Sequence, residues 1–346
     1  MIELALSAAE RGAIPDSLVR FGIRRLLKRR LQDIHSHSVE SFSKNLSEFA
    51  ADMLLAPIAV QAQKANEQHY EVPIAFFEKV LGSKLKYSCA LWESDQETLD
   101  DAEIAALQDT CKFAQLHNGQ KILELGCGWG SLSLWMAEQY PESSILAVSN
   151  SFSQAKFINQ RILELGLTNI TVVTQDMNDF EAQSGYFDRV VSVEMFEHMR
   201  NYTTLYEKIS DWLVHDGIFF KHIFVHRQVP YLFKIEGGND WMSKYFFSGG
   251  MMPSFDLPLM HQSHLHFLDR QVWDGMHYSK TSNAWLDKMD RHRLDLIPLI
   301  KEVYGEEVGL IWWHRWRIFF MACAELFGFR NGQEWWVAHY IFVKKG

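Results

Sequence analysis

The middle of the chain alternates short apolar runs with stretches in which apolar residues recur at helical spacing. The apolar runs read as strands over 121–125, 144–148, 170–174, 187–193 and 217–225. A helix is predicted over 152–165, where Gly166 ends it. This alternation over residues 101–226 predicts an α/β fold with a doubly wound sheet. Ligands of such sheets bind at the carboxyl ends of the strands.

The chain on either side of this core follows other patterns. Residues 1–100 show apolar positions at helical spacing, which predicts an N-terminal helical lobe. Residues 227–310 are rich in aromatic residues, histidine and methionine, and we interpret them as an aromatic cap insertion over the substrate. Residues 311–346 are expected to complete the core with a helix over 313–327 and a strand over 335–343.

Composition narrows the class of protein. The 346 residues are 47% hydrophobic, and no apolar run approaches the roughly 18 residues that a membrane-spanning helix needs. The first residues contain an early acid and no basic segment before an apolar run, so a secretory signal is not expected. The four cysteines are widely separated, which predicts no disulfide framework and fits a reducing, cytoplasmic location.

The net charge of -9 argues against binding to nucleic acid, but basic residues gather between Arg20 and Arg30. Apolar residues between them predict an amphipathic helix that starts after Pro15. These apolar residues are Val19, Ile23, Leu26 and Leu27. The basic face is either the solvated side of a helix docked on the main domain, or a surface that makes peripheral contact with anionic lipid or an acidic substrate. An oligomer is compatible with either interpretation.

A glycine turn joins the first predicted strand to the next helix. The segment E-L-G-C-G-W-G places Gly126, Gly128 and Gly130 at alternate positions, just after Glu124. Glycine suits a turn whose backbone approaches a ligand closely and takes positive φ. The spacing G-x-G-x-G differs from the dinucleotide fingerprint G-x-G-x-x-G. The segment resembles motif I of S-adenosylmethionine (SAM) methyltransferases, which implies that SAM binds here, with Glu124 and the three glycines as contacts.

Polar residues follow the second and third predicted strands. After the second strand no Asp or Glu is available for the ribose hydroxyls, so we expect Ser149, Asn150 or Gln154 to make that contact. Gln175 and Asp176 follow the third strand, and the Asp176 carboxylate can accept a hydrogen bond from the exocyclic amine of adenine. The alternative is that Asp176 caps the turn that follows it.

Three ionisable residues follow the fourth predicted strand. The segment V-E-M-F-E-H contains Glu194, Glu197 and His198, and a spacing of four places Glu194 and His198 on one face if a helix starts here. Methyl transfer is an in-line displacement, and a protonated amine needs a base to free its lone pair. We therefore expect Glu197 and His198 to orient or deprotonate the acceptor, and Glu194 to balance a cationic product. The alternative is a helix-start carboxylate beside a satisfied histidine.

Histidines and aromatic residues after position 260 suggest further chemistry. His264 and His266 would share one face of a strand, but without a carboxylate or cysteine at ligand spacing we expect no metal site. Four aromatic side chains close together would cover the site and contact a sulfonium or ammonium through cation–π interactions. These are Trp273, His277, Tyr278 and Trp285.

Short motifs are spread along nearly the whole chain. They are H-Y-E-V-P with F-F (69–77), Y-S-C-A-L-W (87–92), E-L-G-C-G-W-G (124–130), F-E-H (196–198), K-H-I (221–223) and H-Y-S-K-T with W-L (277–286). Together they resemble the cyclopropane-fatty-acid synthase superfamily, which includes the plant coclaurine-type N-methyltransferases. The resemblance implies a Rossmann-like class I methyltransferase sheet, SAM as cofactor and a small-molecule acceptor. It also places Tyr87 and Ser88 beside SAM.

The resemblance divides within this superfamily. Cyclopropane synthases hold a bicarbonate ion at the positions that match Cys89, Glu197, His222 and Tyr278, so a chain that makes cyclopropane rings would bind bicarbonate here. Glu194 stands where the lipid enzymes usually carry glycine, whereas the alkaloid N-methyltransferases carry a similar E-x-F-E-H motif. Tyr278 departs the other way, since the plant enzymes tend to have phenylalanine there.

Chemistry separates the two reactions in the same way. A lipid alkene has no proton to lose before attack and forms a carbocation afterwards, which an extra carboxylate would capture. An amine acceptor benefits from the same carboxylate, which can take its proton. We therefore predict N-methylation of a small hydrophobic or aromatic amine, with methylene or methyl transfer to an unsaturated fatty acyl phospholipid as the alternative. The full set of acid and base groups disfavours a SAM-binding protein without turnover.

Overall fold

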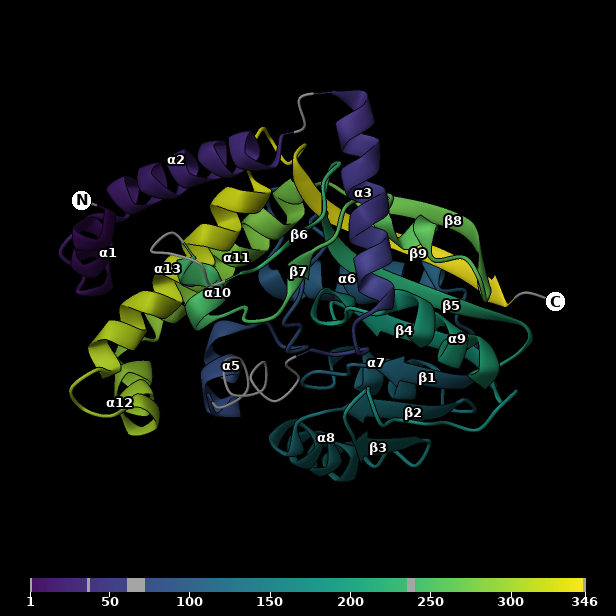
Figure 1. The fold of residues 1–346 in the computed structure, drawn as a ribbon. Coiled ribbons are helices and arrows are strands. Elements are labelled where there is room, and N and C mark those ends of the chain that lie inside the picture. The colour runs from purple at the N-terminus through teal and green to yellow at the C-terminus, as the bar shows by residue number, and fades with distance from the viewer. Residues whose placement is uncertain (1, 36–37, 61–71, 235–239, 345–346) are drawn as a thin grey trace.

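The computed structural model describes residues 2–35, 38–60, 72–234 and 240–344. At its centre lies a seven-stranded sheet in the order β3-β2-β1-β4-β5-β9-β8 (Figure 1). The strands are β1 (Lys121–Leu125), β2 (Ser144–Ser149), β3 (Ile170–Thr174), β4 (Phe187–Val193), β5 (Leu213–His226), β8 (Leu265–Trp273) and β9 (Trp335–Lys344). Strands β1 to β5 pair in parallel, and β9 runs antiparallel to both β5 and β8. The predicted doubly wound α/β sheet is confirmed.

Helices cover both faces of this sheet (Figure 1). Leu123 of β1 packs in a cluster with α9 (Tyr202–Trp212), whereas its neighbour Ile122 packs in a cluster with α6 (Leu99–Phe113). Successive side chains of a strand point to opposite faces, so an apolar run without alternation is buried on both. The apolar character of the strand β1 follows from this double burial.

Further helices and a small second sheet complete the fold. The helices are α1 (Ile2–Glu10), α2 (Asp16–Ile34), α3 (Val39–Leu54), α5 (Ile74–Val80), α7 (Ser131–Gln139), α8 (Phe152–Leu165), α10 (Trp241–Tyr245), α11 (Gly275–Arg291), α12 (Arg293–Tyr304) and α13 (Gly309–Phe327), with single turns η1 (Phe196–His198) and η2 (Leu257–Met260). A separate antiparallel pair is formed by β6 (Tyr231–Leu232) and β7 (Met251–Met252).

The predicted boundaries in the core agree closely with the structure. Strands β1, β3 and β4 begin and end at the predicted residues, and β2 extends to Ser149. Strand β5 starts at Leu213, before the predicted start at Gly217. Helix α8 ends at Gly166, whose φ of +65° lies in the left-handed region that glycine adopts without strain.

The basic helix predicted after Pro15 is α2, which lies along α13 (Figure 1). The α2 side chains that pack against the aromatic core around Trp316 are those of Val19, Ile23, Leu27 and Leu31. Leu26 was expected on the same face but is 39% exposed. The helix is therefore docked on the body of the molecule through its apolar side, as the first of the two interpretations expects.

The division into four ranges stays a prediction, and one strand departs from it. Strand β8 lies within residues 227–310, yet it pairs with β9 at the edge of the main sheet. This part of the expected cap insertion therefore belongs to the core. The strand has polar residues on both faces and an irregular register between Phe267 and Asp269, which explains why the apolar pattern does not reveal it.

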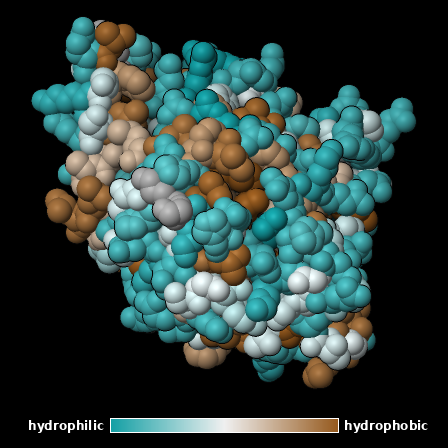
Figure 2. Space-filling view, turned by 90° about the vertical axis from the view of Figure 1, so that its right-hand side faces the viewer, coloured by the Kyte–Doolittle hydropathy of each residue, from teal (hydrophilic) through white to brown (hydrophobic). Residues whose placement is uncertain are grey.

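Hydrophilic residues predominate on the face in Figure 2, with hydrophobic residues gathered near its centre and scattered toward its rim. Scattered apolar side chains are ordinary on a folded surface. Within the described ranges, no helix combines the length and the apolar character needed to cross a membrane.

Candidate active site

The glycine turn after β1 has the backbone conformation that its sequence predicts. Gly126, Gly128 and Gly130 have φ values of +80°, +53° and +83°. The amides of Gly126 and Cys127 both donate to the carbonyl of Val148 in β2, each at 3.0 Å. A Cβ on Gly126 would lie 2.8 Å from Met195. The turn therefore depends on glycine, both for its positive φ and for close approach to the loop after β4.

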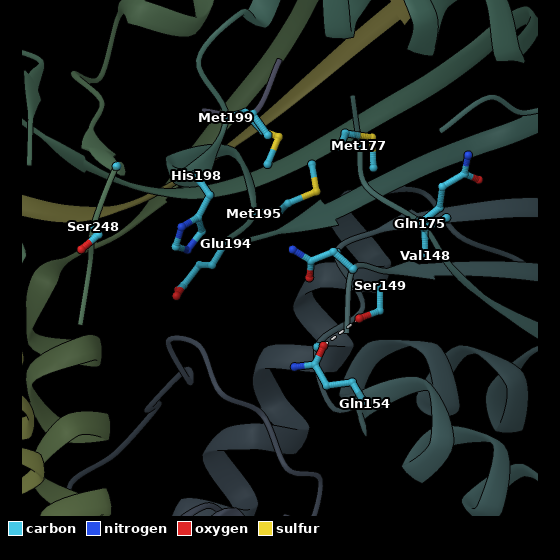
Figure 3. A pocket seen from close by; sticks show the side chains of 15 residues that line it. Val148, Ser149, Gln154, Gln175, Met177, Glu194, Met195, His198, Met199 and Ser248 are labelled. Carbon is cyan, nitrogen blue, oxygen red and sulfur yellow. Dashed lines mark hydrogen bonds between the residues drawn. The ribbon is translucent and has the colours of Figure 1, made fainter. Parts of the chain in front are cut away.

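A hollow of about 760 Å³, counting its open mouth, lies at the carboxyl ends of β1, β2 and β4 (Figure 3). The predicted residues that line it are Gly126, Gly128, Ser149, Asn150, Gln154, Gln175, Glu194 and His198. Residues from four separate predicted motifs thus meet in one cavity.

The end of β2 presents polar groups that fit a nucleoside. The hydroxyl of Ser149 donates to Oε1 of Gln154 at 2.8 Å (Figure 3). The Nε2 atom of Gln154 is buried and donates to no acceptor in the described part of the chain. A buried amide donor needs an acceptor, and a ribose hydroxyl would supply one. A Cβ on Gly128 would meet no atom within 4 Å, so a side chain there would enter space that a ligand can use.

The residues after β3 divide between the cavity and the turn. Gln175 lines the cavity, and its Nε2 donates to the carbonyl of Asp179 at 2.9 Å. Asp176 does not line it. The Asp176 carboxylate accepts from the amide of Asn178 at 2.8 Å, which is the capping role considered as its alternative. Contact between Asp176 and adenine stays a prediction.

Other residues predicted to contact SAM lie behind the cavity wall. Glu124 is buried in β1 and accepts a hydrogen bond from the hydroxyl of Ser133 in α7, and burial raises the pKa of its carboxyl to about 7. Gly130 starts α7, where a Cβ would meet Ile158 at 2.8 Å. Tyr87 packs between the rings of Phe77 and Trp285, and Ser88 accepts from Lys86 at 2.6 Å. None of these four residues lines the cavity, and direct contact of their side chains with SAM stays a prediction.

The carboxylate of Glu194 is the centre of the polar network at this site. Its Oε1 accepts from the backbone amide of Cys89 at 3.0 Å and lies 3.2 Å from Nε2 of His222. Its Oε2 accepts from the hydroxyl of Tyr278 at 2.6 Å. Burial raises the pKa of Glu194, while the charge of Lys86 and these hydrogen bonds oppose the rise. The fold brings the predicted residues Cys89, Glu194, His222 and Tyr278 together, but Cys89 contributes its backbone amide and not its thiol.

His198 lies beside Glu194 on the wall of the cavity (Figure 3). Its ring stacks on Phe247, with 4.6 Å between the ring centroids. Burial lowers the pKa of His198 to about 4, and the charge of Glu194 opposes this shift. The imidazole is therefore neutral near pH 7 and can donate or accept a hydrogen bond. A single turn, η1, replaces the helix considered for this segment, yet Glu194 and His198 still reach the same cavity.

Glu197 lies beneath the cavity and does not line it. The side chain is fully buried, and its Oε1 accepts from the amide of Phe224 at 2.7 Å. Its Oε2 has no hydrogen-bond partner among the residues that the structure describes. Burial raises the pKa of Glu197 well above its usual range, and the Glu194 charge adds to this effect. Glu197 therefore supports the backbone of β5 next to the site. Direct contact of its carboxyl with the acceptor stays a prediction.

The aromatic residues expected to cover the site belong to the core instead. The side chains of Trp273, Tyr278 and Trp285 are buried among α11, α13 and β9, and none lines the cavity. His277 accepts from the amide of Trp92 at 3.1 Å. Only the hydroxyl of Tyr278 reaches the polar network, through Glu194. The expected cation–π cap is therefore wrong for these residues, because the large rings fill the space between helices.

The sequence interpretation missed several groups that form this site. The cavity is also lined by Ala59, Val148, Met177, Met195, Met199, Ser248 and Gly249. Met195 and Met199 flank the predicted E-H pair, so their place in V-E-M-F-E-H-M was a usable signal. Ser248 lies far along the chain, where no pattern pointed to it. Residues 69–71 of the H-Y-E-V-P motif lie outside the described residues. The described residues contain no group of three or more His, Cys, Asp or Glu arranged to hold a metal, and His264 and His266 belong to no such group.

The sheet order, the single reversed strand β9 and the glycine turn beside an acid–base network define the class of SAM-dependent methyltransferases. Within this class, the chain belongs to the family described as mycolic acid cyclopropane synthetase, whose model matches residues 59–335. The resemblance that the motifs indicate is thus confirmed, together with the Rossmann-like class I sheet and SAM as the cofactor.

Individual relatives span both branches of the superfamily. The chain is 35% identical over 351 residues to (S)-coclaurine N-methyltransferase of Thalictrum flavum subsp. glaucum, which covers 100% of this chain and 96% of the relative. It is 31% identical over 285 residues to the cyclopropane-fatty-acyl-phospholipid synthase of Escherichia coli strain K12, covering 81% of this chain and 69% of the relative. A crystal structure of coclaurine N-methyltransferase bound to N-methylheliamine and SAH matches with a TM-score of 0.94 at 34% identity, covering 99% of each chain.

Proposed function

We propose that this chain transfers a methyl group from SAM to the nitrogen of a small hydrophobic or aromatic amine. The observation that carries the proposal is the place of the Glu194 carboxylate. This carboxylate contacts the hydrogen-bonding groups of Cys89, His222 and Tyr278. In cyclopropane synthases the residues at these positions hold bicarbonate. A chain that fills this place with its own side chain has a built-in base. The full-length similarity to a relative named as an N-methyltransferase supports the same reaction.

The site residues divide the work of the reaction. Bound SAM supplies an electrophilic methyl group. The amine reaches the cavity protonated near pH 7, and the Glu194 carboxylate takes the proton that frees the nitrogen lone pair. His198, neutral and adjacent, hydrogen-bonds the amine and orients it. The lone pair then forms the new N–C bond as the S–C bond breaks, and the proton stays on the Glu194 side of the cavity.

The alternative is methylene or methyl transfer to an unsaturated fatty acyl phospholipid. The Tyr278 hydroxyl favours it, since the plant N-methyltransferases tend to have phenylalanine there. The Glu194 carboxylate argues against the lipid reaction, because this side chain fills the position where bicarbonate would bind and would capture a carbocation. Bicarbonate is therefore not proposed as a ligand of the wild-type chain.

Mass spectrometry of products decides between the two reactions. The protein is incubated with SAM and, separately, with a pool of secondary and tertiary amines or with vesicles of unsaturated phospholipid. A gain of one CH2 on an amine supports the proposal, and a gain on the fatty acyl chain alone overturns it. SAM binding by calorimetry without any product would indicate a protein that binds SAM but has no turnover on these acceptors.

We also propose a cytoplasmic location, which is supported by the unpaired state of all four cysteines. Peripheral membrane contact and self-association are further proposals, and α2 is the segment concerned. Arg20 and Arg24 bind Glu325 at 3.1 and 2.8 Å, so these two basic residues serve docking. Arg25, Lys28 and Arg29 are exposed on the same helix and remain available to anionic lipid.

Charge reversal tests the membrane proposal without disturbing the docked face. A variant that combines Arg25→Glu, Lys28→Glu and Arg29→Glu should lose co-sedimentation with anionic vesicles and keep its turnover of a soluble amine. Unchanged co-sedimentation would remove the proposal. Analytical ultracentrifugation of wild type and variant measures self-association in the same samples.

A further inference from the structure

A buried pair of histidines, His222 and His339, lies next to Glu194, and only His222 contacts the carboxylate directly. His222 of β5 and His339 of β9 are direct partners in the antiparallel register, and both are fully buried. Nε2 of His339 lies 3.0 Å from Nδ1 of His222, and Nε2 of His222 lies 3.2 Å from Oε1 of Glu194. The three side chains therefore form one continuous chain of hydrogen bonds that ends at the cavity.

The partners determine where the hydrogens lie in this chain. The Glu194 carboxylate accepts hydrogen bonds from Tyr278 and Cys89, and in the ionised form that the proposed function requires it has no hydrogen to donate. The His222 nitrogen that faces it must then carry a hydrogen. In a neutral imidazole the other nitrogen, Nδ1, is an acceptor, so Nε2 of His339 must donate to it. Burial keeps His222 neutral, since it lowers the pKa of the imidazole well below its usual range.

The ring of His339 lies among aromatic side chains, and the backbone of Gln271 in β8 is the other polar group that favours its charged form. Its ring packs against Trp273 with 4.4 Å between the centroids, and against Phe220 with 5.7 Å. A phenylalanine would fill this aromatic niche without the cost of burying a polar ring. The contact with His222 is the side-chain hydrogen bond that a histidine adds.

We propose that His339 is a positioning residue that fixes the tautomer of His222 and thereby holds the Glu194 carboxylate ionised and aimed at the acceptor. This is the logic by which a second residue orients a catalytic imidazole or a metal ligand. In this arrangement Nε2 of His222 carries a hydrogen toward Glu194, and Nε2 of His339 carries a hydrogen toward His222. The histidine pair therefore accepts no further proton from Glu194. It therefore orients the base and does not carry protons away from it. The assignment of tautomers rests on the hydrogen-bond geometry together with an ionised Glu194 and neutral imidazoles, and its effect on turnover rests on the proposed function.

The direct test is nuclear magnetic resonance of protein labelled with ¹⁵N-histidine, which reports the protonated nitrogen of each imidazole. In wild type, His222 should show hydrogen on Nε2 and none on Nδ1. His339→Phe should disturb that state, whereas His339→Gln should preserve it, because the amide of glutamine can donate from a similar place. His222 protonated on Nδ1 in wild type would overturn the proposal, and this result needs neither a variant nor an acceptor.

Kinetics with an amine acceptor provide the second test. His339→Phe should lower kcat about 10- to 100-fold, with SAM affinity by calorimetry unchanged, and His339→Gln should restore most of the loss. Without the oriented donor the pKa of Glu194 rises, so the acidic limb of the pH profile should move to higher pH in His339→Phe alone. The other groups that face Glu194 are common to all variants: Lys86, Cys89, Glu197, His198 and Tyr278.

Each outcome separates this proposal from the proposed function. An unchanged tautomer and pH profile in a folded His339→Phe protein would overturn the role of His339. A confirmed tautomer with no turnover of any amine would overturn the proposed function and leave the assignment of His222 intact. Circular dichroism and thermal unfolding identify a variant that fails to fold, in which case the wild-type spectrum and His339→Gln decide.

Discussion

The hydroxyl of Tyr278 donates a hydrogen bond of 2.6 Å to the carboxylate of Glu194, although 84 residues separate them in the chain. This contact joins α11 to the loop after β4, where Glu194 has a φ of +49°. Side chains other than glycine cost about 1–2 kcal/mol in this region of backbone conformation. Local backbone energy would favour glycine at this position. The carboxylate is therefore retained for what it binds, and its three hydrogen-bonding partners hold it in place.

The first prediction replaces this carboxylate with an external anion. Glu194→Gly relieves the backbone and leaves the groups of Cys89, His222 and Tyr278 facing an empty place of carboxylate size. Amine methylation should fall about 10²- to 10⁴-fold, as expected on loss of a general base. Added bicarbonate should restore part of the rate, because it can accept the same hydrogen bonds and the proton. Initial rates against bicarbonate concentration, at constant pH and ionic strength, measure this rescue.

Glu194→Gln is the matched control for that experiment. Its amide fills the same space but cannot accept a proton, so bicarbonate should not restore its activity. Equal rescue of both variants, or rescue of neither, would contradict the assignment of Glu194 as a built-in base.

The second prediction concerns the donor cavity at Gly128. Gly128→Val should abolish SAM binding, because its φ of +53° suits glycine and its side chain would enter the cavity. Isothermal titration calorimetry measures the affinity. Gly119→Val is the matched control, since Gly119 also has positive φ, +86°, and a Cβ there meets nothing within 4 Å. It carries the same kind of backbone strain outside the cavity and should bind SAM normally. Normal affinity in Gly128→Val would place SAM elsewhere.

The strands and the glycine turn could be predicted because their causes are local. A run of apolar residues buried on both faces gives β1 its boundaries, apolar runs also mark β3 and β4, and positive φ at Gly126, Gly128 and Gly166 explains why glycine stands there. Strand β8 forms because it pairs with β9. Because it lies at the edge of the sheet, its residues are partly exposed and many of them are polar. Its pattern alone therefore gives no strand.

The site could be predicted as a set of residues but not as an arrangement. Spacing indicated that Glu194, Glu197 and His198 act together, yet the single turn η1 turns Glu197 into the core while its neighbour His198 faces the cavity. The partner of His222 on β9 follows from strand register, which no motif encodes. Aromatic residues looked like a cap because composition does not distinguish a core between helices from a cavity wall.

The third prediction separates the roles of His198 and Glu197. His198→Ala should lower kcat about 10²-fold, since it removes a hydrogen-bonding group beside the acceptor. Glu197→Gln should change kcat only a few-fold, because the amide can still accept from Phe224 and resembles the neutral carboxyl that burial favours. Because the pKa of His198 is about 4, the imidazole stays neutral down to that pH. Loss of rate between pH 8 and pH 5 should therefore be the same in wild type and His198→Ala. A wild-type rate in His198→Ala would contradict the assignment of His198 to acceptor chemistry, and a large loss of rate in Glu197→Gln would contradict the minor role expected for Glu197.

The last prediction uses the buried carboxyl of Glu124, which has an ordinary pKa of 4.5 when unfolded and about 7 when folded. The folded state holds this proton more tightly, so the contribution of Glu124 to the free energy of unfolding falls as pH rises from about 4.5 to about 7. Glu124→Gln keeps an acceptor for Ser133 and removes the titration. The variant should match wild type near pH 4 and exceed it by up to about 3 kcal/mol at pH 8. Urea unfolding without ligand at several pH values measures the difference. Glu207→Gln, at an exposed carboxylate of α9, is the control for the same substitution at the surface. A constant difference between Glu124→Gln and wild type across this range would show that the Glu124 carboxyl keeps an ordinary pKa in the fold.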